Sequence, residues 1–188
     1  MTEHVEESFA NHDFSSEDIS FTLYEQCVFE QCQFQEMHIH RTIFRACEFK
    51  TCRWINVEFE ACKWQDLHFQ ACQLIGIHVH PAALQQVQWT FLDCQISSLL
   101  CEYMELERSL FQTCDLKESS FFDCKLQGTS FRGSRLEGTI FERNNLKKCD
   151  FRGATSYELD PFKNEIKGSQ FSLPEALVLL KSLKIKIE

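Results

Sequence analysis

The segment CVFEQCQFQEMHIHRTIF, residues 27–44, decides the fold, because an apolar or aromatic residue returns in it every five positions. The same step of five runs from Phe9 to Val79 and again from Phe91 to Phe151, which gives 28 positions in all. Fourteen of the 18 phenylalanines stand at these positions, called position i below. A period of five matches neither a helix of about 3.6 residues per turn nor a strand of period 2. It predicts a chain that turns a corner every five residues.

A second set of residues follows the same period. Ten of the 11 cysteines stand two residues before position i, where the other residues are small or apolar. Five of the six glycines stand two residues after position i, where a bend favours a small residue. Like residues also recur every 20 positions, as in Phe9, Phe29, Phe49 and Phe69. Four sides per coil explain this longer period, so the sequence predicts a solenoid with two inward-facing columns per side.

This pattern resembles the pentapeptide-repeat family, whose members fold as right-handed quadrilateral β-helices. The resemblance covers residues 7–153, and residues 1–6 are expected to form an N-terminal tail. Seven coils, at roughly 4.8 Å between neighbouring strands, predict a rod roughly 34 Å long. The expected fold class is therefore all-β, with a short C-terminal α-helix after the rod.

The phase of the repeat slips by two residues between Val79 and Ile96. We expect a loop or bulge near residues 80–95, most simply within residues 80–90, because Pro81 lies there. Such a loop could be a harmless bulge. It could also be a recognition loop on a rigid scaffold, with Pro81, Gln85 and Gln86 contacting a partner.

Residues 154–188 are expected to form a capping and dimerisation module. Ser172-Leu-Pro-Glu175 is typical of a capping box with Ser172 as the N-cap of a helix. The apolar residues of this helix cover more than one stripe, so one side could close the end of the coil while the other pairs with a second copy of the chain. A monomeric cap is the alternative. The predicted dimer contacts are Leu173, Leu177, Leu180, Leu183, Ile185 and Ile187.

The candidate chemical groups of the sequence are cysteines and histidines. Cysteines such as Cys27, Cys32 and Cys52 are separated by one or more whole steps of five, which is not the spacing of zinc-binding pairs, so we interpret the cysteines as core residues. Two outward ladders are predicted on one side, Asp18/His38/Glu58/His78 and Ser20/His40/Glu60/His80. They could hold a metal ion, although a solvated mixed ladder is the simpler interpretation. No catalytic or cofactor-binding motif is present in the sequence, so neither enzymatic activity nor a cofactor is expected.

The net charge of −9 is unevenly distributed. Residues 1–40 contain nine acidic residues and no Lys or Arg. The acidic balance argues against direct nucleic-acid binding, and it suggests instead an acidic end that attracts a basic, DNA-binding surface of a protein. The candidate contacts are Glu7, Asp13, Glu17, Asp18, Glu25, Glu30 and Glu36.

The rod, its mid-chain break and its apolar C-terminal tail are similar to the Qnr, MfpA and McbG group of the pentapeptide-repeat family. That resemblance implies a homodimer that binds DNA gyrase or topoisomerase IV, partly by DNA mimicry, and protects it from quinolones or peptide toxins. An interaction scaffold with an unrelated protein partner is the alternative, and a metal-binding module is a third hypothesis. A cytoplasmic location is expected, because residues 1–7 are acidic and no apolar run reaches the ~18 residues of a membrane span.

Overall fold

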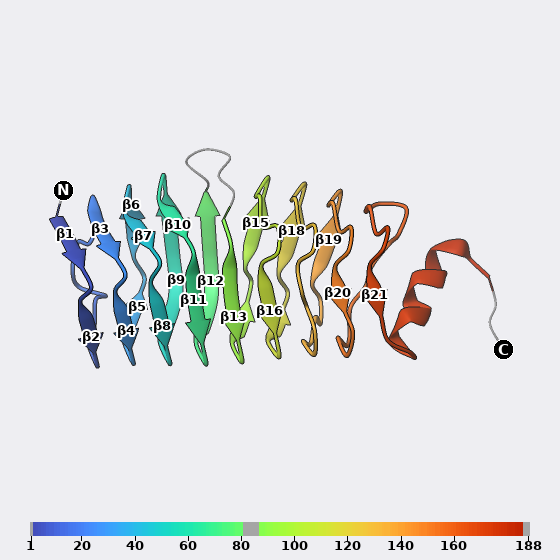
Figure 1. Ribbon diagram of the computed structural model, residues 1–188, viewed down its shortest axis with the longest axis horizontal. Coiled ribbons are helices and arrows are strands. Elements are labelled where there is room, and N and C mark those ends of the chain that lie inside the picture. Colours follow the sequence, from blue (N-terminus) through green and yellow to red (C-terminus); the bar gives the residue numbers. More distant parts are fainter. Residues whose placement is uncertain (1, 81–86, 186–188) are drawn as a thin grey trace.

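The computed structural model, which describes residues 2–80 and 87–185, is a right-handed four-sided parallel β-helix of about eight turns with one short helix at its C-terminal end (Figure 1). The predicted fold class is confirmed. The short strands stack side by side along the rod, and the two termini lie at opposite ends of it.

Each side of the rod is a ladder of parallel strands. Face 1 contains β1 (Thr2–Val5), β3 (Thr22–Glu25), β7 (Ile43–Arg45) and β10 (Lys63–Gln65). Face 2 contains β2 (Ser8–Ala10), β4 (Val28–Glu30), β8 (Glu48–Lys50), β11 (Leu67–Gln70), β13 (Trp89–Leu92) and β16 (Leu110–Gln112), followed by β20 (Asp150–Phe151) and β21 (Gln170–Phe171).

The other two faces share two longer strands. Face 3 contains β5 (Gln33–Gln35), β14 (Gln95–Ser97) and β17 (Asp115–Lys117). Face 4 contains β6 (His38–His40), β15 (Leu100–Glu102), β18 (Ser120–Phe122) and β19 (Ile140–Glu142). Strands β9 (Arg53–Glu60) and β12 (Gln73–His80) run through the corner between faces 3 and 4.

The register of these ladders locates the phase slip. Val79 pairs with Phe59, which is four steps of five earlier, whereas the pairing of Trp89 with Leu67 spans two positions more. The two extra positions therefore lie between His80 and Trp89. Because β13 and β14 are regular coil strands, the break is shorter than the expected span of residues 80–95.

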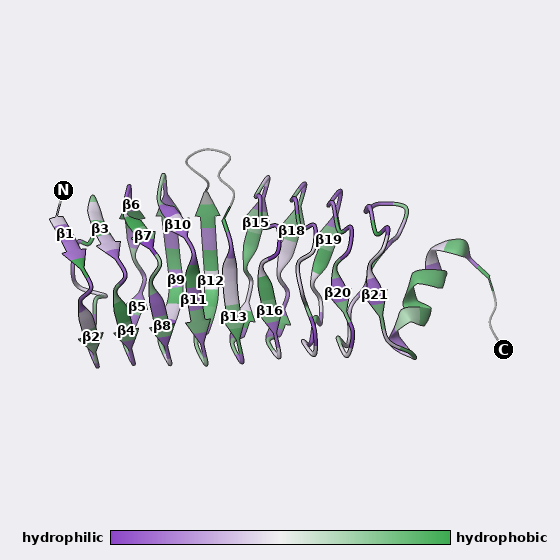
Figure 2. Cartoon of the chain, viewed as in Figure 1, coloured by the Kyte–Doolittle hydropathy of each residue, from purple (hydrophilic) through white to green (hydrophobic). Residues whose placement is uncertain are grey.

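The core is a set of aromatic stacks. Nine phenylalanines, from Phe9 to Phe171, stack along face 2 with neighbouring ring centres 4.7–5.3 Å apart. The stack continues through the slip, since the Phe69 and Phe91 rings are 4.7 Å apart. Figure 2 shows the corresponding alternation of apolar and polar residues along the coils. The repeat of like residues thus fixes the register, because each ring fits best over the ring of the preceding coil.

Both ends of the rod differ from expectation. The expected tail, residues 1–6, supplies β1, which pairs with β3 and places the His4 ring 5.0 Å from the Tyr24 ring in a parallel stack. His4 lies five residues before Phe9, so the inward position begins one step earlier with a polar ring that the apolar pattern did not include.

The coil also continues past Phe151, so that the rod has about eight turns instead of seven. Glu158 pairs with Ile140, two positions short of the usual spacing, whereas Glu165 pairs with Asn145 at the usual spacing. This last coil thus has two residues fewer than usual between Thr155 and Glu158 and two more than usual between Glu158 and Glu165. A strict step of five in the sequence therefore does not detect it. Pro161 is accommodated within it.

The C-terminal helix is η1 (Glu175–Leu183), a 3₁₀ helix rather than the expected α-helix. Its N-cap is Pro174, with no side-chain cap. The predicted capping box is wrong, because the Ser172 hydroxyl accepts a hydrogen bond from the backbone N–H of Gly153, at 3.1 Å, and so caps the coil instead of the helix. Among the described residues, no helix has the length and apolar character needed to cross a membrane.

Candidate functional site

The interior of the coil is occupied by packing. All 11 cysteines are free and buried, as expected for core residues. Burial raises the pKa of the Cys47 and Cys149 thiols to about 12, so both stay protonated near neutral pH. A protonated, buried thiol is neither a nucleophile nor a metal ligand. The cysteine columns therefore contribute to stability, and the candidate functional groups lie on the outside.

The same columns also carry hydrogen bonds that the sequence interpretation missed. At many corners the residue two before position i donates to a backbone carbonyl of the preceding coil, whether the donor is a thiol, a hydroxyl or an amide. Cys62 donates to Ile39 at 3.2 Å, and Thr129 donates to Leu106 at 2.8 Å. A buried polar hydrogen without an acceptor would be costly, and a carbonyl oxygen has two lone pairs to offer. Cys, Ser, Thr and Asn share a donor hydrogen, and this was the available signal.

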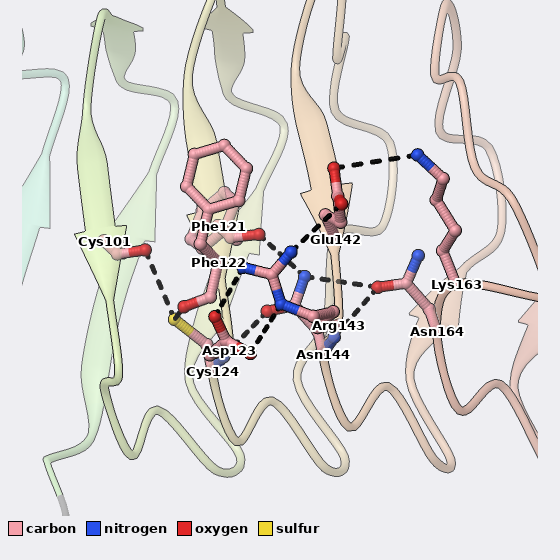
Figure 3. Close-up of polar contacts among 10 residues, drawn as sticks. All are labelled: Cys101, Phe121, Phe122, Asp123, Cys124, Glu142, Arg143, Asn144, Lys163 and Asn164. Carbon is pink, nitrogen blue, oxygen red and sulfur yellow. Dashed lines mark hydrogen bonds and ion pairs between the residues drawn. The ribbon is translucent and has the colours of Figure 1, made fainter.

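Figure 3 shows the strongest part of this ladder. The Asn144 amide donates to the Phe121 carbonyl at 2.8 Å, and its oxygen accepts from the backbone N–H of Cys124 at 2.8 Å. Asn164 repeats the arrangement one coil later. On the outside of the same corner, Arg143 bonds both carboxylate oxygens of Asp123, at 2.9 and 2.7 Å. The corner is thus held from both sides.

The candidate acidic residues do not form one patch. They are distributed around the first two coils, and several have local partners: Glu7 pairs with His4 at 2.9 Å, and Glu25 pairs with Arg45 at 3.1 Å. Asp13 and Asp18 accept hydrogen bonds from the side chains and backbone amides of Ser15 and Ser20, which lower the pKa of each carboxyl. Glu30 and Glu36 are exposed and form no ion pair within residues 2–80 and 87–185.

Three of these acids meet the histidine ladder. Glu17, Asp18 and Glu36 line a shallow hollow of about 420 Å³ with His38 and His40. Glu17 also pairs with His12 at 2.6 Å. The acidic N-terminal end and the histidines of face 4 are therefore parts of one surface, to which Asp18, a member of both predicted sets, belongs.

From β6 onward the predicted ladders have the expected register on face 4. Asp18 and Ser20, their predicted first members, lie outside the strands. His38 pairs with Glu58 and Glu58 with His78, while His40 pairs with Glu60 and Glu60 with His80. The side chains converge at one point: His40 Nδ1 lies 2.9 Å and His38 Nε2 lies 3.4 Å from the same Glu60 oxygen. The two imidazole rings stack 4.1 Å apart. His78 is exposed on the next coil. The alternation of imidazole and carboxylate thus brings two imidazoles, those of His38 and His40, to the Glu60 carboxylate instead of forming two equal rows.

The candidate recognition loop is only partly described. Pro81, Gln85 and Gln86 lie outside the described residues. On its C-terminal side, Val87 and Trp89 are buried, and the Trp89 indole N–H donates to the Trp64 carbonyl at 3.3 Å. The chain has therefore rejoined the core by Val87.

The C-terminal helix has two kinds of apolar residue. Val178 and Leu179 pack against the core and close the end of the coil. Leu173, Leu177, Leu183 and Ile185 are exposed, Leu173 at 76%. Leu180 is half-buried, and Ile187 lies outside the described residues. Figure 2 shows the helix as predominantly apolar. The C-terminal segment thus has a packed side and an exposed side, and the exposed side is a candidate contact surface.

A further exposed apolar group was missed from the sequence. Tyr103 and Ile140, exposed at 62% and 48%, lie toward face 4 in the C-terminal half, where Leu100 and Phe122 also point outward. Ile140 and Val178 line a hollow of about 320 Å³ between the rod and the helix. Their signal was an apolar or aromatic residue one or two residues from position i, at an outward position where most coils have a polar one.

The comparisons with known proteins identify the class. Sequence descriptions of the family match residues 23–99, as "Pentapeptide repeat region", and residues 119–155, as "Pentapeptide repeats (8 copies)", which together are more than half of the chain. The chain belongs to the pentapeptide-repeat family. No curated protein matches it at a significant level.

Several solved structures of low sequence identity are also similar to this chain. QnrB1, a plasmid-mediated fluoroquinolone resistance protein, is 14% identical with a TM-score of 0.47, and the match covers 99% of this chain and 100% of that one. Rfr23, a pentapeptide-repeat protein from Cyanothece 51142, is 13% identical with a TM-score of 0.36, over 70% of this chain and 88% of its own. HetL from Nostoc sp. PCC 7120, involved in heterocyst differentiation regulation, is 13% identical with a TM-score of 0.27, over 90% and 86%.

Proposed function

We propose that this protein acts in the cytosol by binding, without catalysis, to a type II topoisomerase, DNA gyrase or topoisomerase IV, and protects it from quinolones or peptide toxins. The observation that supports a binding role is the division of the molecule into a packed interior and a chemically varied exterior. The interior is filled by stacked rings and buried, free thiols, so recognition has to use the outer faces.

The charge distribution supports a basic partner surface. Residues 1–40 have nine acidic side chains and no Lys or Arg, and most of the candidate acids are exposed in the first two coils. An acidic end of this kind attracts a DNA-binding groove and accelerates encounter with it. This chemistry, together with the resemblance of the sequence to gyrase-protecting proteins, supports a topoisomerase as the partner to test first.

Mimicry of DNA by this surface is partial. About eight turns at roughly 4.8 Å make a rod of roughly 38 Å. Duplex DNA of that length carries about 22 phosphate charges at one per ~1.7 Å, whereas the net charge of the chain is −9. Several carboxylates are also paired with His or Arg. Shape and specific contacts, including the hollow on face 4, therefore have to add to the electrostatic attraction.

We also propose that the exposed side of the C-terminal helix joins two copies of the chain. Leu173, Leu177 and Leu183 point away from the coil, and a symmetric pair of helices would remove them from water. Such a dimer would place the two acidic ends at its outer tips.

A supercoiling assay tests the proposed partner. Supercoiling by gyrase and, in a separate decatenation assay, the activity of topoisomerase IV would be measured with ciprofloxacin over a range of protein concentrations. We expect micromolar concentrations of the protein to restore the activity of the enzyme in the presence of ciprofloxacin and to reduce the number of drug-stabilised DNA breaks. Absence of both protection and inhibition with both enzymes would overturn the proposal.

A charge-matched pair of variants tests which surface is used. Glu30→Gln with Glu36→Gln should raise the protein concentration needed for protection roughly tenfold at low salt. Glu102→Gln with Glu118→Gln removes the same charge from exposed acids of the C-terminal half, and Glu118 occupies the same type of corner as Glu36. Equal losses in both variants would indicate a general charge effect and contradict the assignment of the surface.

The dimer is tested without disturbing the core. Leu173→Glu with Leu177→Glu should convert a dimer of about 44 kDa, twice the 22.1 kDa chain, into a monomer in sedimentation equilibrium. Phe162→Glu, at a residue 73% exposed on the last coil, is the control and should leave the mass unchanged. A wild-type protein that is monomeric at all concentrations would contradict the dimer.

One observation favours the alternative of a scaffold with an unrelated partner. Tyr103 and Ile140 expose apolar surface, which suits an apolar protein surface better than a basic one. If this alternative holds, Tyr103→Ser with Ile140→Ser would abolish capture of the partner from a cell extract, while the two Glu30 and Glu36 substitutions would not.

A further inference from the structure

The point of convergence on face 4 has the composition of a metal site. His38 and His40 flank Ile39, which is 1% exposed, on β6, so both imidazoles point outward on either side of a fixed residue. Glu60 follows the buried Phe59 on β9, the neighbouring strand, in register with His40. The backbone of two paired strands therefore positions all three side chains, and none depends on a loop.

The distances match the ligand shell of a single ion. The His40 Nδ1 and His38 Nε2 atoms lie 2.9 and 3.4 Å from Glu60 Oε2, and the three potential ligand atoms all lie within 4.8 Å of one another. Ligands about 2.0–2.1 Å from zinc in a tetrahedron are about 3.3 Å apart. Small rotations of exposed side chains would bring all three atoms to one ion, with the backbone unchanged.

The donor set selects the class of ion. Two imidazoles and one carboxylate suit zinc and neighbouring transition metals, whereas Mg²⁺ and Ca²⁺ prefer oxygen ligands alone. Three protein ligands leave one tetrahedral position for water or for a side chain of a partner.

The surrounding charge favours a cation. Glu17, Asp18 and Glu36 line the hollow beside His38 and His40. Arg41 lies on the other side, in a hollow lined also by His40 and Glu60, but its guanidinium carbon is placed over the Phe21 ring, 5.9 Å from the ring centre. The acidic side chains thus outnumber the one arginine around this point.

We propose that His38, His40 and Glu60 form a surface site for a divalent transition-metal ion, with zinc as the ion to be tested. The proposal does not depend on the identity of the protein partner, because the three ligands come from one chain. The ion would lie on the same surface as the acidic end and would locally reverse its charge.

Isothermal titration of the chelator-treated full-length protein with ZnCl₂ tests the site. We expect one equivalent to bind, and excess Mg²⁺ not to displace it. Co²⁺ should give the visible spectrum of a tetrahedral nitrogen and oxygen site without a thiolate charge-transfer band, which separates it from binding at cysteines. A thiolate band, or displacement by Mg²⁺, would overturn the assignment.

Variants locate the ion. His38→Ala, His40→Ala and Glu60→Gln each remove one ligand at an outward position and should weaken zinc binding by about tenfold or more. The matched control is His68→Ala on face 2, because exposed His68 also faces a carboxylate, Glu48, on the adjacent strand but has no second imidazole beside it among the residues that the structure describes. The control should bind like the wild type. No binding by the wild type, or equal binding by the His38→Ala, His40→Ala double variant, would refute the proposal.

Discussion

Residues 2–80 and residues 87–171 build the same coil from different side chains. In the first half, face 1 is lined by Tyr24, Phe44 and Trp64, and the donors at the corners are mostly thiols. In the second half, face 1 is lined by Leu106, Leu126 and Leu146, and hydroxyl and amide donors become common. The first half therefore depends more on aromatic packing, and the second half more on buried hydrogen bonds.

The corners differ in the same way. In the second half, glycine corners are hydrogen-bonded turns: Gly128 has a φ of +74°, and the N–H of Thr129 donates to the Leu126 carbonyl at 2.9 Å, as in a type II turn. In the first half, non-glycine residues such as Ala46 and Ala71, at φ values of 50° and 52°, occupy nearly all the corners, whereas the second half uses non-glycine residues such as Thr113 and Asp123 beside glycine. One backbone path thus tolerates two kinds of corner, because stacking of the coils stabilises the strained residues. Four measurements test this difference between the two halves.

The largest expected effect is loss of stability at alkaline pH. Burial raises the pKa of Cys47, Cys124 and Cys149 to about 12, 11 and 12. A thiol whose pKa is higher in the folded than in the unfolded state stabilises the fold fully below the unfolded pKa of about 8.5. This stabilisation is lost as the pH rises from that value through the folded pKa. Ionisation of each thiol in the unfolded state should lower the free energy of unfolding by about 2 kcal/mol at pH 10. Urea unfolding at pH 8 and pH 10 measures the change.

The control replaces thiols by hydroxyls that the fold already uses. Cys47→Thr with Cys149→Thr copies Thr129, which lies in the same column, and should reduce the alkaline loss by about 4 kcal/mol. An unchanged pH dependence would mean that these thiols are not the groups responsible.

Removing an aromatic ring comes second. Phe44→Ala should lower the free energy of unfolding by about 3–5 kcal/mol, because the ring is 1% exposed and stacks 5.2 Å from the Tyr24 ring. Leu126→Ala, at the same column in the second half, should cost less, about 2–4 kcal/mol. Chemical denaturation would measure both. If Leu126→Ala costs as much as Phe44→Ala, the halves do not differ in their dependence on aromatic packing.

Removal of a buried hydrogen bond should cost more stability in the second half than in the first. Asn144→Leu removes the side-chain donor to the Phe121 carbonyl and the acceptor of the Cys124 N–H, and should cost about 2–4 kcal/mol. Cys62→Ala, in the same column of the first half, removes one thiol bond to Ile39 and should cost about 1 kcal/mol. Equal costs, measured by the same unfolding assay, would show that thiol and amide corners are equivalent.

The smallest effects are expected at the corners. Gly128→Ala should cost about 1–2 kcal/mol from its left-handed backbone alone, because the nearest atom to an added Cβ is Arg108 Cγ at 3.6 Å, an ordinary contact. Ala46→Gly should change stability by less than about 0.5 kcal/mol, since relief of strain is offset by greater freedom of the unfolded chain. Thermal unfolding would detect both. A large gain in Ala46→Gly would show that the first half retains uncompensated strain.

Much of the fold could be predicted because residues four repeats apart in sequence are neighbours in space. Phe29, Phe49 and Phe69 predict their own stack, and the phase slip appears as a break in their spacing. The last coil could not be predicted in this way. The pairing of Ile140 with Glu158 is two positions shorter than the period, and only contact with the preceding coil reveals it.

The candidate site could be predicted in register but not in detail. The period of the coil places His40 opposite Glu60, whereas the convergence of His38 on that carboxylate depends on side-chain rotamers. For the acidic residues, proximity in the sequence does not give proximity in space. Glu25, Glu30 and Asp13 lie on different faces of the rod, because the chain turns a corner every five residues.

The four-sided coil, its inward columns and its register follow from the amino-acid sequence, since 28 repeats of one five-residue step are compatible with one geometry. The folded coil adds which carbonyl each corner side chain meets, how the helix closes the last coil and which histidines share a carboxylate. These contacts involve residues that are far apart along the chain. Periodicity records which residues face inward, whereas these contacts join groups from different coils and exist only once the coils have stacked.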